Sequence, residues 1–113
     1  MSDQRLFLLI TIVNRGNGTK VMERYKEQGV SFHVLSHGYG SADSELLEIL
    51  GLGETEKDVI LSIGNDVETE TVMTGWRENK KIQDQGKGIV FTVPLSAIVG
   101  QQVLSYLTER AVQ

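Results

Sequence analysis

The chain has 113 residues, enough for one hydrophobic core but not for two. Hydrophobic residues make up 40% and charged residues 23%, which is typical of a folded globular protein and excludes a disordered chain. The lack of cysteine excludes disulfides, thiolate metal sites and cysteine nucleophiles, and the net charge of −4 argues against a broad nucleic-acid surface. We therefore expect residues 1–113 to form a single domain that binds no nucleic acid.

No apolar run is long enough to cross a membrane. The longest, residues 6–13, is interrupted by Thr11 and is far shorter than the ~20 residues of a spanning helix. It also lacks the basic segment and the cleavage site of a secretory signal, since Asp3 and Arg5 flank it. The sequence therefore predicts a cytoplasmic protein without membrane insertion.

The first elements predicted are a strand and a helix. Residues 5–13 are short, β-branched and apolar on both faces, which indicates a strand that needs cover on both sides. A turn at residues 14–18 leads into an amphipathic helix over residues 19–28. Gly29 is its expected C-terminal stop, because glycine adopts the left-handed backbone found there.

A second strand and a long connection follow. Residues 31–38 alternate as a strand, and His33 and His37 share one of its faces. Their separation of ~13 Å along a strand is too wide for one metal ion, so we interpret both as packed or solvated histidines. Residues 39–57 form the connection, which contains one short helical pattern at 44–50.

The second half predicts a strand, a helix and a final strand. Residues 58–63 are an apolar strand, and we interpret the charged run 54–58 as a solvated turn that enters it. Asp66 is the expected N-cap of the second helix. The buried stripe of that helix is predicted to contain Val72, Met73 and Trp76.

The last strand is expected at residues 88–93, after a polar loop at 79–87 and before Pro94. A helical turn is predicted at residues 95–99. A C-terminal helical extension beyond Gly100 is indicated by the apolar spacing of Val103, Leu104 and Leu107.

The element order is β-α-β-β-α-β, which predicts an α+β, ferredoxin-like antiparallel sheet with two helices on one face. In that arrangement the first and third strands are central. The second apolar face of the first strand then needs another cover. Self-association or the C-terminal helix would supply it.

Twelve glycines include four Gly-x-Gly pairs, at 16/18, 38/40, 51/53 and 86/88. None continues into the longer glycine motifs that bind dinucleotides or the phosphates of ATP. We interpret 16/18 and 51/53 as ordinary turns. The pairs 38/40 and 86/88 are candidate functional sites, because the fold places them at the ends of strands.

Three segments resemble the nitrogen regulatory protein P-II superfamily, and the resemblance extends over most of residues 5–99. Gly38-Tyr39-Gly40 is similar to the start of that family's T-loop, and Ser44-Glu45-Leu46-Leu47 resembles its tip. The stretch from Gly86 to Pro94 is similar to the B-loop and last strand. Either Gly86-Lys87-Gly88 replaces the family's Gly-Asp-Gly, or Asp84-Gln85-Gly86-Lys87 matches it with one insertion.

The resemblance implies a homotrimer that binds ATP, ADP or another adenine nucleotide in clefts between subunits and performs no catalysis. It implies that the 39–57 loop regulates a partner protein such as a transporter or an enzyme, through Ser44, Glu45, Leu46 and Leu47. Glycine-rich turns suit such a site, because backbone N–H groups reach a phosphate where no Cβ intervenes, and Lys87 adds positive charge. The ligand-binding residues implied are Gly38, Tyr39, Gly40, Gly86, Lys87 and Gly88.

Two alternatives stay open. Residues 96–100 lack the arginine pair that the family carries there, which favours a P-II-fold module without nucleotide binding, like the related divalent-cation tolerance trimers. The other alternative is a small ferredoxin-fold phosphate-handling hydrolase. It would need an arginine in a glycine-rich phosphate cradle, and Arg15 beside Gly16 and Gly18 is the candidate.

Overall fold

The computed structural model describes residues 5–39, 56–78, 88–97 and 99–100. Within them the predicted order of strands and helices is confirmed. The predicted helical segment at 44–50, the loop at 79–87 and the C-terminal helix lie outside the described residues. The elements are β1 (Leu6–Asn14), α1 (Gly18–Glu27), β2 (Phe32–Tyr39), β3 (Glu56–Asn65), α3 (Asp66–Glu78) and β4 (Gly88–Pro94).

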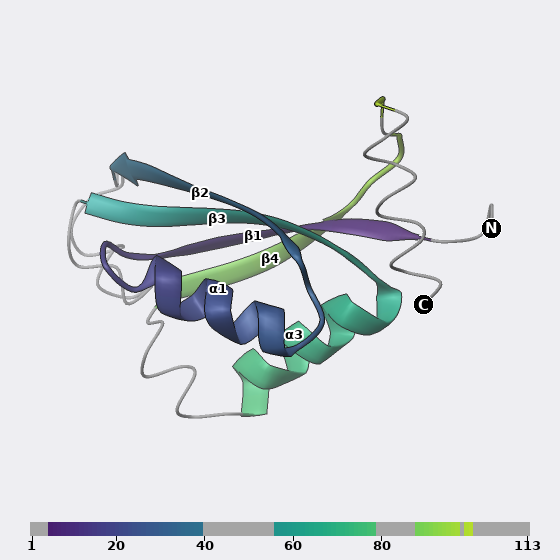
Figure 1. Ribbon diagram of the computed structural model, residues 1–113, viewed down its shortest axis with the longest axis horizontal. Coiled ribbons are helices and arrows are strands. Elements are labelled where there is room, and N and C mark those ends of the chain that lie inside the picture. Colours follow the sequence, from purple (N-terminus) through teal and green to yellow (C-terminus); the bar gives the residue numbers. More distant parts are fainter. Residues whose placement is uncertain (1–4, 40–55, 79–87, 98, 101–113) are drawn as a thin grey trace.

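The strands form one antiparallel sheet in the order β2-β3-β1-β4. The two most apolar strands, β1 and β3, are therefore central, as predicted. Figure 1 shows α1 and α3 together on one face of this sheet. The chain thus has a ferredoxin-like α+β fold, because both helices return the chain across the same side of the sheet.

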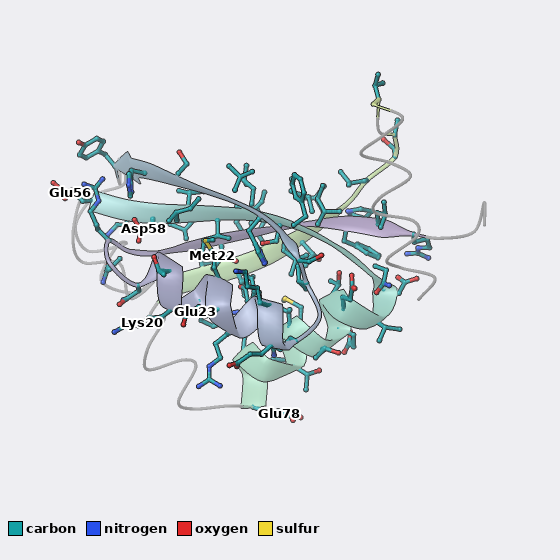
Figure 2. The ribbon with its side chains drawn as sticks, in the orientation of Figure 1. Lys20, Met22, Glu23, Glu56, Asp58 and Glu78 are labelled. Carbon is teal, nitrogen blue, oxygen red and sulfur yellow. The ribbon has the colours of Figure 1, made fainter. Side chains whose placement is uncertain are left out.

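α1 presents an apolar stripe to the sheet and charged residues to solvent. Met22 lies between the helix and the sheet, whereas Lys20 and Glu23 are exposed (Figure 2). The helix ends as predicted at Gly29, whose φ is +96°. The amide of Gly29 donates to Lys26 and that of Val30 donates to Tyr25, the paired bonds of a Schellman cap.

The N-cap of α3 lies one residue earlier than predicted. The side chain of Asn65 accepts a hydrogen bond from the Glu68 amide at 2.8 Å, and Glu68 accepts one from the Asn65 amide at 3.0 Å. This reciprocal pair is a capping box. The prediction of Asp66 as the N-cap is therefore wrong, because Asn65 at the end of β3 performs that role and Asp66 is the first helical residue.

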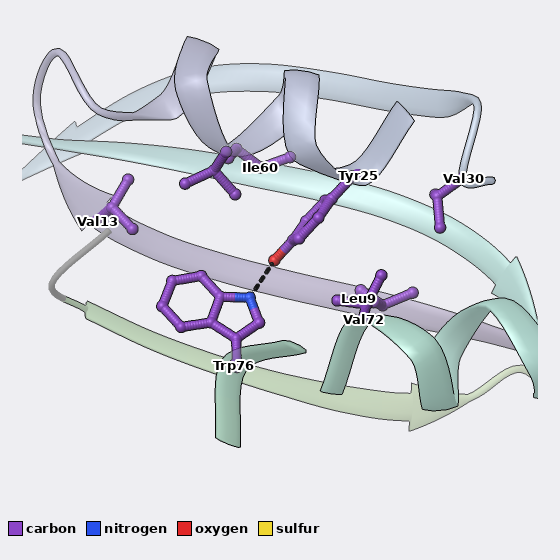
Figure 3. Close-up of a cluster of buried hydrophobic side chains, with 8 residues drawn as sticks. Leu9, Val13, Tyr25, Val30, Ile60, Val72 and Trp76 are labelled. Carbon is purple, nitrogen blue, oxygen red and sulfur yellow. Dashed lines mark hydrogen bonds between the residues drawn. The ribbon is translucent and has the colours of Figure 1, made fainter. Parts of the chain in front are cut away.

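The core lies between the helices and the sheet and contains one polar network (Figure 3). The indole N–H of Trp76 donates to the Tyr25 hydroxyl at 2.9 Å, and that hydroxyl lies 2.7 Å from Thr11 Oγ1. Burial raises the pKa of the Tyr25 phenol, which its hydrogen bonds only partly offset, so the phenol is neutral. The surrounding apolar side chains are Leu9, Val13, Val21, Val30, Ile60 and Val72.

The other face of the sheet carries apolar side chains on all four strands, and we call it the open face. Strand register places these residues side by side, since directly paired residues point to the same side. Val34 is 46% exposed, and Phe91 and Val93 are each 41% exposed. The open face contains Leu8, Ile10, Ile12, Phe32, Val34, Val59, Leu61, Ile63, Ile89, Phe91 and Val93.

The segment after β4 differs from its prediction. Residues 95–97, together with 99 and 100, are not helical, so the helical turn expected there is wrong. The amide of Leu95 donates to the carbonyl of Leu6 at 3.0 Å. Hydrogen bonding to β1 thus continues one residue beyond Pro94.

We predict that Tyr25→Phe lowers the free energy of unfolding by about 1–3 kcal/mol, since it removes the partner of a fully buried Thr11 hydroxyl and the acceptor of the Trp76 N–H. Urea unfolding followed by circular dichroism would measure the loss. Tyr39→Phe is the matched control, because Tyr39 is 75% exposed. Equal stabilities of the two variants would contradict a stabilising role for the network.

Candidate functional site

One end of the sheet brings together the predicted site residues that the structure describes. Gly38 of β2 pairs with Lys57 of β3, and Lys57 pairs with Asn14 of β1. On the other side of β1, Val13 pairs with Gly88 of β4. The strand ends that carry the two candidate glycine pairs therefore lie in one row across the sheet.

The remaining predicted residues fall into two groups. Tyr39 ends β2 and is 75% exposed at this end of the sheet. The others lie outside the described residues, and their roles stay predictions: Gly40, Gly86, Lys87 and the partner loop of Ser44, Glu45, Leu46 and Leu47.

Gly38 and Gly88 occupy opposite edges of the sheet. Three strand spacings of ~4.8 Å separate them, or about 14 Å. A phosphate is too small to touch both backbones across that distance. A site that uses both of these glycines on a single phosphate therefore needs β2 of one copy beside β4 of another.

Gly88 has a packing role of its own. A Cβ at this position would collide with the carbonyl oxygen of Ile12 in β1. At Gly38 the nearest atom to an added Cβ is Val59 Cγ2 at 3.7 Å, which is ordinary contact. The close approach of β4 to β1 therefore explains the glycine at 88, whereas packing leaves the one at 38 unexplained.

The buried carboxylate of Asp58 lies at the centre of this end, although the sequence predicts a solvated turn there. That interpretation is wrong for Lys57 and Asp58, which are each 3% exposed and lie within β3. Asp58 Oδ2 accepts hydrogen bonds from the Gly16 amide at 2.9 Å and the Gly18 amide at 3.0 Å. A buried charge is stable only when it is paired and hydrogen-bonded, and these bonds meet part of that need.

His37 supplies the third partner of Asp58. Its Nδ1 lies 2.9 Å from Asp58 Oδ1, and its side chain is 61% exposed whereas that of Asp58 is 4% exposed. Burial raises the pKa of Asp58, but hydrogen bonds from Gly18, Gly16 and His37, with the charge of the imidazole, outweigh it and leave the pKa below its usual value. Asp58 is therefore an ionised carboxylate at neutral pH.

The turn between β1 and α1 is more than the ordinary turn expected from the Gly-x-Gly pair at 16/18. Gly16 has φ +98°, a left-handed conformation that favours glycine. The side chain of Asn17 does not cap α1. The amide of Gly18 at the start of the helix donates instead to the carboxylate of Asp58, 40 residues further along the chain. The two glycines shape the turn so that both of their amides donate hydrogen bonds to the Asp58 carboxylate.

Two further contacts close the same end of the sheet. Lys57 Nζ donates to Asn14 Oδ1 at 2.9 Å on the side opposite Asp58. The guanidinium of Arg15 lies 3.1 Å from Glu56 Oε2, and the Arg15 amide donates to the Glu56 carbonyl at 3.2 Å. Figure 2 shows Glu56 and Asp58 at the end of the sheet where α1 begins.

The two histidines have different surroundings. His33 is held at both nitrogens, with Nδ1 2.9 Å from Ser62 Oγ and Nε2 2.9 Å from the Val30 carbonyl. Burial lowers the pKa of His33. The hydrogen bond to the Val30 carbonyl opposes this effect but is weaker, so the neutral ring is favoured. His33 is thus a packed histidine, as interpreted from the sequence, and no group of three metal-ligating side chains occurs among the described residues.

A sheet of this order with two helices on one face is the ferredoxin-like fold of the PII and CutA1 structures, which confirms the resemblance at the level of fold. The sequence matches no family model and no curated protein. In the described residues no helix is long and apolar enough to span a membrane.

Three solved structures illustrate the likeness. Bacillus subtilis GlnK, solved as an ATP complex, is 17% identical with a TM-score of 0.58, over 87% of this chain and 88% of that one. CPII of Thiomonas intermedia K12, solved with ADP, AMP and acetate, is 12% identical with a TM-score of 0.60, over 82% and 90%. The divalent ion tolerance protein CutA1 of Ehrlichia chaffeensis is 8% identical with a TM-score of 0.61, over 96% and 97%.

We predict that Gly18→Ala destabilises the fold by about 1–3 kcal/mol, because the new Cβ would lie 2.8 Å from Asp58 Oδ2 and 2.9 Å from Leu35 Cδ1. Chemical denaturation would measure the change. Gly38→Ala serves as the control, since its Cβ makes ordinary contacts. If both variants keep wild-type stability, the fit of the turn to Asp58 is looser than the distances indicate.

Proposed function

We propose that the protein is a P-II-like signalling protein that works as a trimer. It binds a small effector such as an adenine nucleotide at clefts between subunits and regulates a partner protein through residues 39–57. The observation that carries this proposal is the position of Gly38 and Gly88 on opposite edges of one sheet end. Copies set side by side would bring the two strand ends together.

The open face supports self-association. Its apolar side chains extend over all four strands, and several are more than 40% exposed in the single chain. Large contiguous apolar surfaces are rare on soluble monomers and mark contact surfaces, because their exposure to water is costly. A trimer in which the open faces turn toward a common axis would cover them and leave the helices outside.

Adenine nucleotide is the proposed effector class because two structures of the same fold were solved with ATP or with ADP and AMP. The second candidate is a module without nucleotide binding, and the fold of CutA1 and the lack of arginine at 96–100 favour it. A phosphate-handling hydrolase is disfavoured. The amides of Gly16 and Gly18, which would form its phosphate cradle, donate to the Asp58 carboxylate instead.

We predict that Val34→Asp reduces the mass of the assembly in multi-angle light scattering, because it places a charge on the open face. Val67→Asp, on α3, should leave the mass unchanged. Both valines are exposed in the single chain, at 46% and 72%, so neither change disturbs the core. A wild-type monomer, or an equal effect of the two substitutions, would refute association through the open face.

We predict that isothermal titration calorimetry with ATP, ADP, AMP and cyclic AMP detects binding of at least one nucleotide, and that Lys87→Ala weakens it about tenfold through loss of one charged contact. Lys20→Ala is the control, because it removes the same positive charge at an exposed position of α1. Absence of heat with all four ligands would favour the module without nucleotide binding. Unchanged affinity in Lys87→Ala would remove Lys87 from the site.

A further inference from the structure

His37 differs from His33 in what its second ring nitrogen contacts. The Nδ1 of His37 faces Asp58, its ring is 61% exposed, and no contact holds its Nε2 within the described part of the chain. Both nitrogens of His33 are engaged. The chain therefore carries one exposed imidazole whose orientation is set from within the protein.

Asp58 determines the state of that ring. An ionised carboxylate only accepts hydrogen bonds, so His37 presents Nδ1–H to it, and in the neutral ring the lone pair is on Nε2. The carboxylate cannot turn away, because its other oxygen is held by the amides of Gly16 and Gly18. A carboxylate so placed also stabilises the positive charge that the imidazole acquires when Nε2 forms a bond.

Metal binding and nucleophilic attack both use such a nitrogen, and the structure favours the second. A protein metal site needs about three protein ligands, and the described residues contain no such cluster. A nucleophile needs one nitrogen and an open approach. Arg15, which is 36% exposed at the same end of the sheet, supplies a guanidinium of the geometry that pairs with phosphoryl oxygens. Glu56 holds it in an ion pair that is half exposed, so a phosphoryl group can compete for it.

We propose that His37 is a phosphorylation site, at which Nε2 accepts a phosphoryl group from a high-energy phosphoryl donor. The Nε2 lone pair forms the N–P bond while the bond from phosphorus to the leaving group breaks, and the leaving group departs with that electron pair. The proton on Nδ1 stays on the ring, and Asp58 balances the positive charge of the phosphorylated imidazolium. The inference is independent of nucleotide binding and of trimer formation.

Potassium phosphoramidate is a small donor that tests this directly, with ammonia as the leaving group. Mass spectrometry of the wild-type chain is expected to show one acid-labile phosphoryl group, mapped to His37. The rate should exceed that of N-acetylhistidine at least about tenfold, the scale of effects that a carboxylate partner has on a histidine. Modification at His33, or a rate at His37 no greater than that of N-acetylhistidine, would overturn the proposal.

Three variants distinguish an effect of the His37–Asp58 pair, which we call the dyad, from an effect of the exposure of His37 alone. His37→Gln should take up no phosphoryl group, and His33→Gln should react as the wild type does. Asp58→Asn should slow the reaction at least about tenfold while circular dichroism shows that the chain is folded. Wild-type reactivity in folded Asp58→Asn would overturn the role of the carboxylate.

A measurement on the wild type covers the case in which Asp58→Asn does not fold. Nitrogen-15 NMR distinguishes the two neutral forms of a histidine ring. The dyad requires that His37 carries its proton on Nδ1. A ring protonated mainly on Nε2 would leave no nucleophilic lone pair on the exposed side, and this result would overturn the proposal.

Discussion

The Asp58 carboxylate is the contact on which one end of the molecule depends. It joins β3 to the turn before α1 and to the end of β2, three segments that are far apart in sequence. A buried charge left without partners costs several kcal/mol, so these segments must stay together while Asp58 is ionised. The start of α1 and the ends of β2 and β3 are consequently held together by the same carboxylate.

The order of elements was predictable because it depends on local patterns. Alternation and β-branched residues indicate strands, and Gly29 marks the end of α1 by its own backbone preference. The errors at Lys57 and Asp58 concern residues whose structure depends on distant partners. Lys57 and Asp58 have the charges of a solvated turn, yet Asn14, the turn glycines and His37 lie where they can bind them.

The candidate site was predictable in part. Chain order alone brings Gly38 and Gly88 to the same end of the sheet, but the position of Asp58 opposite His37 requires the register between β2 and β3. Register depends on how whole faces pack, and a slip of one residue would move Asp58 to the open face. The alternation of β2 did place His37 on one face with His33, and this was the one sequence signal for the dyad.

Trp76 gives the protein an optical reporter with a useful location. It is the sole tryptophan, it is 9% exposed, and its indole packs between α3 and the sheet on the helix side. The open face is on the other side of the sheet. Unfolding exposes this indole to water and changes its fluorescence, whereas dissociation into folded monomers leaves it buried. Fluorescence of Trp76 therefore distinguishes loss of the fold from loss of the assembly.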